Sequence, residues 1–285
     1  MLHLLFTGDV QGSFEPCGCA GGPTGGLARR AGYARSLEGE RSGVIHIDAG
    51  NYLAPPGPDA DRVNRLMIRS LEMLPIAAMN LGADDTYWWR KLAPELRART
   101  QLVAANLEPR RDDVPAPGKY TVQEFPIPGR EGKAFRIAFV GLVDPVLVKP
   151  ISGFRGQDPT AALRAVLPEL RGKTDWIVVL LDTVRRGGVP PEGSLIRRLV
   201  EAAPEIDVLI TTEKRFVKYE PVEIGKTLIL SSIERGRFLG DLQLFFDEAG
   251  RLVDRKVEFV EMKIGVPEDP ALLEEQRILH ELLGN

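Results

Sequence analysis

Hydrophobic residues along this chain follow two alternating patterns. Short apolar runs are typical of strands buried on both faces, and apolar positions spaced by three or four residues are typical of amphipathic helices. Their alternation predicts an α/β fold. The predicted strands are residues 2–6, 43–48, 101–105, 133–143, 176–181, 207–210, 227–231, 237–246 and 252–263, the last an antiparallel edge strand. The predicted helices are residues 27–37, 59–74, 91–99, 159–170, 194–203 and 267–283.

The composition is that of an ordinary globular protein. A chain of 285 residues with 44% hydrophobic and 27% charged residues can bury a substantial core. The net charge of −3 excludes an overall basic field that would attract nucleic acid. No apolar run is long enough to span a bilayer, and residues 2–6 lack the length and positive flank of a signal peptide. We therefore predict neither a nucleic-acid partner nor a transmembrane segment.

The first thirty residues combine a strand, a glycine-rich loop and a helix. The strand delivers Asp9 to its carboxyl end, where ligands bind in α/β proteins. The loop contains both cysteines of the chain and closes on Gly25 and Gly26, which can take backbone conformations that other residues avoid. This arrangement predicts that chemistry, if present, is located around Asp9.

Acidic or amide side chains follow several of the predicted strands. One such residue means little, because Asp and Asn favour turns and helix caps. A series of them at the same edge of a sheet predicts a site. The residues in this series are Asp9, Asp48 with Asn51, Asp84 with Asp85, Asn106, Asp182 and Glu213.

Short motifs along the chain resemble the N-terminal metallophosphoesterase domain of the 5′-nucleotidases, which has the calcineurin-like fold. They are GDVQG (8–12), EP (15–16), GGLAR (25–29), DAGN (48–51), MNLGADD (79–85), AN (105–106), VGL (140–142), VLLDT (179–183), DVLITTEKR (207–215) and GRFLGDL (236–242). The resemblance covers roughly residues 2–262 in the right order. It implies a four-layer α/β/β/α sandwich with two mixed sheets at residues 1–264, followed by a linker helix at 265–285.

The family's metal ligands are mostly replaced. In the family, Asp, His, a bridging Asp, Asn and three further His hold two divalent metals, and another His protonates the leaving oxygen. Asp9 alone matches a ligand unchanged. Gln11 replaces the first His, Asn51 the bridging Asp, Ala83 the Asn, Asp84 the catalytic His, and Thr183, Glu213 and Arg215 the later His residues. An amide cannot bridge two cations with charge, and an arginine repels a dication. We therefore predict that the dinuclear centre is lost and that the protein is no efficient phosphomonoesterase.

Two interpretations of the remaining acidic residues stay open. They could hold one divalent cation at most through oxygen ligands, drawn from Asp9, Gln11, Asp48, Asn51, Asp85, Asp182 and Glu213. Asp84 would then be the proton donor, Arg29 and Arg215 the phosphate contacts, and a small phosphorylated molecule the substrate of a weak hydrolase. Equally, no ion binds, and the acids cap helices or pair with Arg185, Lys214 and Arg215.

The two cysteines form an unusual Cys17-Gly18-Cys19 sequence on the loop beside Asp9. Two thiols at this spacing can chelate a soft ion or be oxidised, or they can be inert and packed. The sequence EPCGC followed by GGLARR also resembles a subgroup of nucleotidase-like bacterial proteins, some of which occur beside multihaem cytochrome modules. That resemblance implies a redox or envelope partner protein and a periplasmic or exported location, with the cytoplasm as the alternative.

Overall fold

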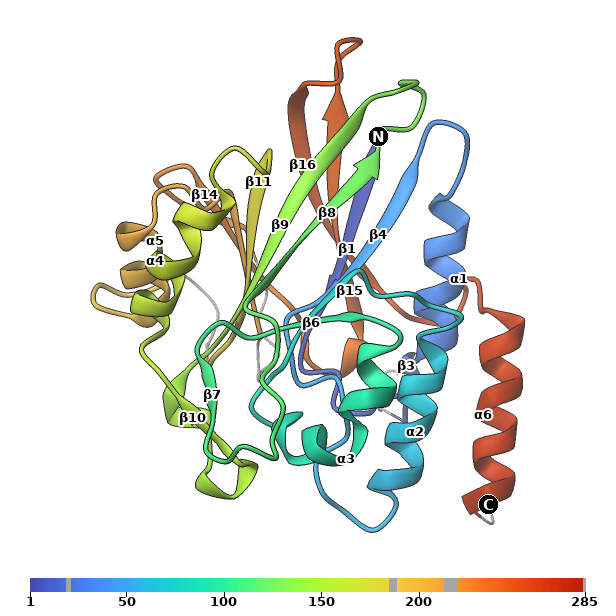
Figure 1. The fold of residues 1–285 in the computed structure, drawn as a ribbon. Helices are drawn as coiled ribbons and strands as arrows, with labels where there is room; N and C mark the ends of the chain where they lie inside the picture. The colour runs from blue at the N-terminus through green and yellow to red at the C-terminus, as the bar shows by residue number, and fades with distance from the viewer. Residues whose placement is uncertain (19–21, 185–188, 213–219, 284–285) are drawn as a thin grey trace.

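The computed structural model describes residues 1–18, 22–184, 189–212 and 220–283 (Figure 1). It contains two six-stranded sheets that pack face to face, with helices on both outer faces. The predicted four-layer α/β/β/α sandwich with two mixed sheets is therefore confirmed. None of the helices in the described part of the chain is long and apolar enough to cross a membrane.

The first sheet has the strand order β16-β15-β1-β4-β5-β6. The last four strands in this order are parallel, and β15 and β16 are antiparallel additions at the other edge. Their bounds are β1 (Leu2–Thr7), β4 (Gly43–Asp48), β5 (Ala78–Asn80), β6 (Gln101–Val103), β15 (Phe238–Phe246) and β16 (Leu252–Glu261).

The second sheet has the order β13-β14-β12-β11-β9-β8. Its four central strands are parallel, and β8 and β13 are antiparallel edge strands. The bounds are β8 (Tyr120–Pro126), β9 (Ala134–Val143), β11 (Trp176–Asp182), β12 (Val208–Thr211), β13 (Val222–Ile224) and β14 (Thr227–Ser231).

Three hydrophobic layers hold the sandwich together. Leu4 and Phe6 of β1 contribute to the layer between the sheets, whereas Leu5 points to the opposite face, because side chains alternate along a strand. That second layer lies under α1 (Leu27–Leu37), α2 (Ala60–Ser70) and α3 (Thr86–Arg97). The third lies between the second sheet and α4 (Pro159–Leu170) with α5 (Leu195–Ala202).

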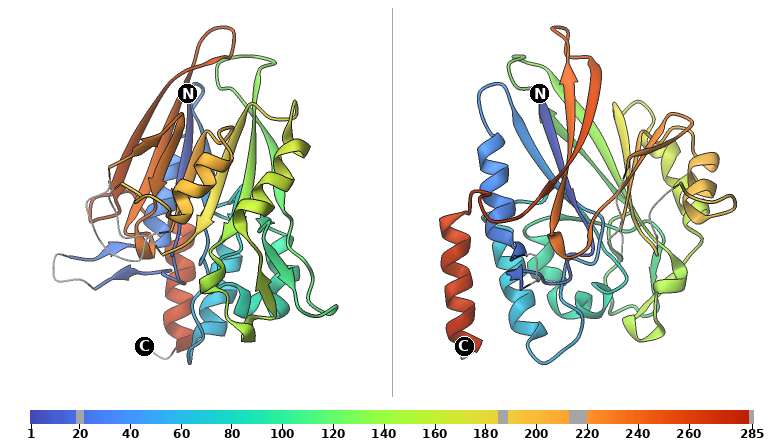
Figure 2. Two further views of the ribbon diagram at one scale, coloured as in Figure 1. Left: turned by 90° about the vertical axis from the view of Figure 1, so that its left-hand side faces the viewer. Right: turned by 180° about the vertical axis from the view of Figure 1, so that it is seen from behind.

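The last helix, α6 (Pro270–Leu283), lies beside α1 and α2 (Figures 1 and 2). Leu272 is fully buried there, and Glu275 pairs with Arg69 of α2 at 2.8 Å. The apolar stripe predicted for this segment therefore includes at least one residue packed on the domain. The proposed role of residues 265–285 as a linker stays a prediction.

Several short elements were not predicted from the sequence. They are the hairpin β2 (Pro16–Cys17) and β3 (Thr24–Gly25), the pair β7 (Leu107–Pro109) and β10 (Phe154–Gly156), the strands β8 and β13, and the 3-10 turns η1 (Pro145–Leu147), η2 (Pro150–Ser152) and η3 (Glu234–Gly236). The helix predicted at 91–99 begins earlier, at Thr86, because Trp89 and Leu92 both pack into the core.

Candidate functional site

Three polar side chains meet at the carboxyl ends of the parallel strands. Asp9 follows β1, Asn51 follows β4, and Asp182 ends β11, so both sheets contribute. All three residues are fully buried. The Asn51 amide nitrogen Nδ2 donates to Asp9 Oδ1 at 2.7 Å and to Asp182 Oδ1 at 2.9 Å. A neutral amide thus joins two acidic side chains from different sheets.

A hydrogen bond to the side-chain oxygen of Asn51 fixes the orientation of this amide. Asn51 Oδ1 accepts a hydrogen bond from the backbone N–H of Asp84 at 2.9 Å. A flipped amide would place its NH₂ group against that N–H and its oxygen against the two carboxylates, which would be repulsive at both ends. The N–H groups of Asn51 therefore face Asp9 and Asp182.

Asp182 accepts hydrogen bonds from neutral donors on three sides. Besides Asn51, they are the backbone N–H of Ala83, at 2.7 Å from Oδ2, and the Thr212 hydroxyl, at 3.0 Å from Oδ1. Ala83 lies just before α3, so Asp182 is also located near the positive end of that helix dipole. Donors of this kind stabilise the ionised form of a buried aspartate.

Asp85 holds the loop after β4 against the start of α3. Its carboxylate accepts from the backbone N–H groups of Asn51 and Leu53, both at 2.8 Å, and of Gly82 at 3.1 Å. Burial raises the pKa of Asp85 well above its usual value, and these hydrogen bonds oppose that shift. The geometry gives Asp85 a structural role. Asp84, predicted as the proton donor, is half-buried and contributes its backbone N–H to Asn51.

The backbone around the site has an uncommon conformation. Asp9, Gln11 and Asn51 have φ angles of 51°, 50° and 58° in the left-handed region. Asn and Asp tolerate this region better than most residues, whereas Gln11 is under strain. Backbone hydrogen bonds from Asp9 to Gly50 and from Gln11 to Asn51, both 2.8 Å, hold the two loops together. The loops are thus fixed by each other.

Asp48 faces a buried polar layer behind these loops. Its carboxylate accepts from the Thr7 hydroxyl at 2.6 Å and from Gly50 N–H at 2.8 Å, yet burial raises its pKa to about 6. The nearby guanidinium of Arg30 is almost fully buried, and burial lowers its pKa. Burial and the Arg30 charge together lower the pKa of His46 to about 3, so this imidazole stays neutral.

The remaining predicted residues lie apart from the Asn51 amide or outside the described residues. Arg29 pairs with Glu268 at 3.0 Å and donates to the carbonyl of Pro23 at 2.6 Å, so it holds α1 to the segment before α6. Cys17 is half-buried on β2, with its sulfur 3.2 Å from Thr24 Oγ1. Cys19, Glu213 and Arg215 lie outside the described residues.

A surface hollow of about 320 Å³ lies next to Cys17. It is lined by residues 11–17 together with Val63 and Arg235. Gln11, predicted as a replaced metal ligand, lines this hollow. The hollow therefore connects the loop that follows Asp9 with the cysteine loop.

The donors around the Asn51 amide do not suit a divalent cation. Among the described residues, no group of three or more His, Cys, Asp and Glu side chains is arranged to hold a metal ion. Asp9 and Asp182 offer oxygen, but between them Asn51 presents N–H groups where a cation requires lone pairs. The arrangement at these three residues therefore stabilises carboxylates by hydrogen bonding.

Comparison with known proteins finds matches among solved structures only. No family model and no curated protein matches this sequence. A 5′-nucleotidase precursor from Thermus thermophilus superposes with a TM-score of 0.77 at 21% identity, covering 99% of this chain and 59% of that one. The sulfate thiohydrolase SoxB from Thermus thermophilus gives 0.78 at 16%, covering 99% and 60%. The calcineurin-like phosphoesterase YfkN from Bacillus subtilis gives 0.76 at 15%, covering 99% and 97%.

The architecture is that of a two-sheet α/β sandwich. More specifically, the chain has the fold of the N-terminal metallophosphoesterase domain of 5′-nucleotidases and calcineurin-like phosphoesterases, as the sequence motifs predicted. It spans about 60% of the length of the first two proteins, at 59% and 60%. At these identities the likeness establishes the fold, and the activity has to be argued from the residues of the site.

Sequence reasoning missed two contributors to the site. Thr212 follows the predicted strand 207–210, but its neutral hydroxyl gave no reason to single it out. Arg30 was not among the predicted site residues, although it is nearly fully buried. The buried positions Leu27, Ala31 and Ala34 on the same helix were the available signal, because Arg30 shares their face.

Proposed function

We propose that this protein is a non-hydrolytic member of the metallophosphoesterase fold. The observation that carries this proposal is the Asn51 side chain, whose two N–H groups engage Asp9 and Asp182 while its oxygen accepts from Asp84 N–H. Phosphoryl transfer in this fold depends on charge stabilisation by cations held between carboxylates and imidazoles. Here no imidazole of the described residues reaches this cluster, and the amide takes up the space between the carboxylates.

The test is turnover of phosphate esters by the purified protein. We expect no hydrolysis of an aryl phosphate mono- or diester, or of a nucleoside monophosphate, above the rate of Mn²⁺ or Co²⁺ in buffer. Asp9→Asn is the matched variant, because Asn keeps the size and tolerates the positive φ of 51°. Metal-dependent turnover that disappears in Asp9→Asn would instead establish the weak phosphoesterase that the acidic residues left open.

Thiol chemistry at Cys17 and Cys19 is a second candidate function. It is favoured by the position of Cys17, which is half-buried and lines the hollow next to the Asp9 loop. Two thiolates can bind a soft cation. Alternatively, they can close a disulfide, passing two electrons to a disulfide oxidant such as oxidised glutathione, which becomes two thiols after protons are transferred. A tight disulfide of this spacing would be readily reduced.

Thiol titration distinguishes this candidate from two inert cysteines. We expect two titratable thiols in the reduced protein, none after oxidised glutathione, and no intramolecular disulfide in Cys17→Ser. Intact-mass measurement separates a disulfide from glutathione adducts. Thiols that neither react nor bind Zn²⁺ in the native protein would exclude the role. A redox partner and an exported location belong to the same proposal, and they rest on the EPCGC resemblance.

A further inference from the structure

The Asn51 amide lies where two buried carboxylates converge, and the spacing of the atoms is informative. Nδ2 is 2.7 Å from Asp9 Oδ1 and 2.9 Å from Asp182 Oδ1. Neighbouring oxygen ligands on a small octahedral cation lie about 3 Å apart, since they are bonded at about 2.1 Å and at right angles. Nδ2 is therefore about as far from each of these two oxygens as one ligand of such an ion is from its neighbour, but Nδ2 is a nitrogen that donates protons.

This nitrogen opposes the binding of a cation. The two N–H bonds of Asn51 point toward the carboxylate oxygens. An ion at this position would need a ligand that offers a lone pair, and Nδ2 offers partial positive charge instead. The amide cannot turn over, because Asp84 N–H binds its oxygen at 2.9 Å. The amide thus donates to one oxygen of each carboxylate and opposes the entry of an ion.

We propose that Asn51 is the residue that excludes divalent cations from this site, and that Asn51→Asp alone creates a single cation site from the carboxylates of residues 9, 51 and 182. The inference rests on the proposed function in that the natural protein does not work through a metal centre. It concerns an ion held by carboxylate oxygens, such as Mg²⁺, Mn²⁺ or Ca²⁺.

The backbone permits this exchange. Residue 51 has a φ of 58°, a conformation that Asn and Asp both adopt. A carboxylate at this position can still accept from Asp84 N–H with one oxygen and present the other to the ion. Without an ion, three acidic groups are buried together, so the variant should be less stable than the natural protein.

Thermal unfolding after chelation, with and without 1 mM MnCl₂, MgCl₂ or CaCl₂, tests the proposal on the full chain. For Asn51→Asp we expect Tm to fall without metal and to rise by about 2–3 °C with metal, as for a dissociation constant of about 0.1 mM. The natural protein should show no shift. The double variant Asp9→Asn with Asn51→Asp should lose the metal response.

Asn106→Asp is the matched control. Asn106 is also buried, and its amide also makes three hydrogen bonds, but they go to backbone groups of Val143 and Gln157. This variant should be destabilised without a metal response comparable to that of Asn51→Asp. An equal response in both would show that any buried carboxylate gives the effect, and it would overturn the proposal.

Two further results would contradict it. One is an Asn51→Asp protein that folds but shows no shift in Tm with any of the three metals. The other is a natural protein that binds Mn²⁺ at a site abolished by Asp9→Asn, measured by electron paramagnetic resonance. The second measurement decides the matter even if Asn51→Asp fails to fold. Neither readout involves turnover, so a phosphatase activity would overturn the proposed function independently of this result.

Discussion

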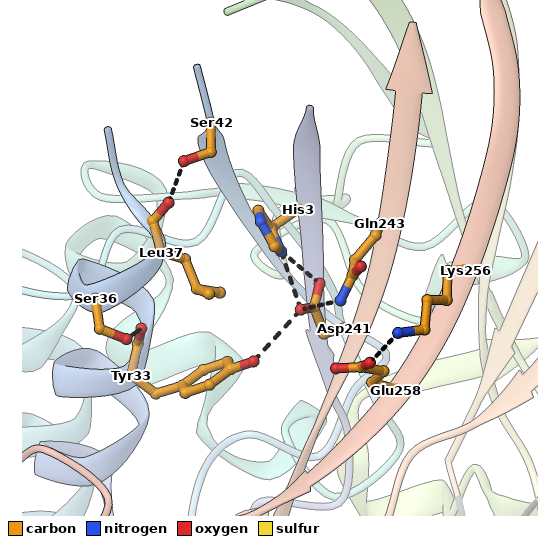
Figure 3. Close-up of polar contacts among 9 residues, drawn as sticks. All are labelled: His3, Tyr33, Ser36, Leu37, Ser42, Asp241, Gln243, Lys256 and Glu258. Carbon is orange, nitrogen blue, oxygen red and sulfur yellow. Dashed lines mark hydrogen bonds and ion pairs between the residues drawn. The ribbon is translucent and has the colours of Figure 1, made fainter. Parts of the chain in front are cut away.

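Buried carboxylates are stabilised in two different ways in this molecule. At the strand ends, Asp9 and Asp182 share the neutral amide of Asn51. Between α1 and the first sheet, Asp241 instead faces an imidazole: His3 Nδ1 lies 2.9 Å from both of its oxygens (Figure 3). Tyr33 donates to the same carboxylate at 3.4 Å, and Gln243 does so at 3.2 Å.

The two clusters differ in the backbone that carries them. His3 and Asp241 lie on regular antiparallel strands, with His3 opposite Gln243 and Asp241 opposite Leu5. The Asn51 cluster is built on loops with positive φ, and it depends on backbone N–H groups. The pair on regular strands can be exchanged for apolar side chains. The loop cluster cannot be exchanged in the same way, because it also needs backbone with positive φ and backbone N–H donors. We therefore interpret the first cluster as part of the packing and the second as the feature on which the proposed function depends.

Asn51→Ala should have the largest effect on stability. It removes the donor that two buried carboxylates share, and it places Ala in the left-handed region, so we expect the free energy of unfolding to fall by about 3–5 kcal/mol. Chemical denaturation measures this. Asn51→Gly is the control, because it removes the side chain without the φ strain and should be about 1 kcal/mol less damaging. A Gly variant as stable as the natural protein would show that the amide stabilises nothing.

His3→Leu should cost about 2–4 kcal/mol, because it leaves Asp241 buried without the imidazole. The double variant His3→Leu with Asp241→Leu should recover most of this loss, since a buried polar pair can often be replaced by apolar residues. A double-mutant cycle by urea denaturation measures the coupling. If the double variant is as unstable as the two single costs combined, this cluster is not the replaceable one.

Asp48 should make stability depend on pH. Its pKa is about 6 in the folded protein against 3.8 as the reference value, so the protonated form is favoured by folding. The resulting stabilisation of the folded protein is about 2–3 kcal/mol. It is fully present below pH 3.8 and is lost as the pH rises through about 6. His46, whose pKa is lowered to about 3, has the opposite slope in this range. The test is therefore the difference in denaturation midpoints between the natural protein and Asp48→Asn from pH 4 to 7. A constant difference would refute the shift.

Glu258→Gln should have the smallest effect. Glu258 and Lys256 form an ion pair beside Asp241 (Figure 3), but their side chains are 41% and 61% exposed. Exposed pairs contribute little, so we expect a change of at most about 0.5 kcal/mol, which decreases further in high salt. A loss above about 1.5 kcal/mol in the same denaturation assay would indicate that the Asp241 cluster extends to this surface pair.

The architecture could be predicted from the sequence because each strand and helix is encoded by its own local pattern of residues. Fully apolar runs such as residues 176–181 and the 3–4 spacing of residues 59–74 are direct signals of buried strands and amphipathic helices. The sequence also indicated that Asp9, Asn51 and Asp182 lie at strand ends, but it placed them at the edge of one sheet. In the structure Asp9 and Asn51 follow strands of the first sheet, and Asp182 ends a strand of the second. The weakly patterned edge strand β8 carried no such signal, since its residues are only partly buried.

The chemistry of the site was harder to predict from sequence. Nothing in the residue types shows that Asn51 uses both N–H groups on carboxylates from two sheets, or that Ala83 contributes through its backbone. Such contacts depend on the relative position of segments far apart along the chain, 131 residues in the case of Asn51 and Asp182. Arg29 shows the converse, because its charge indicated a ligand contact and its guanidinium pairs with Glu268.

A crystal structure after soaking in Mn²⁺, with anomalous data, tests the central claim most directly. The account predicts that Asn51 Nδ2 stays within hydrogen-bond distance of both Asp9 and Asp182 and that no anomalous peak lies between them. A peak at this position, with Asn51 turned so that its oxygen binds the ion, would contradict it.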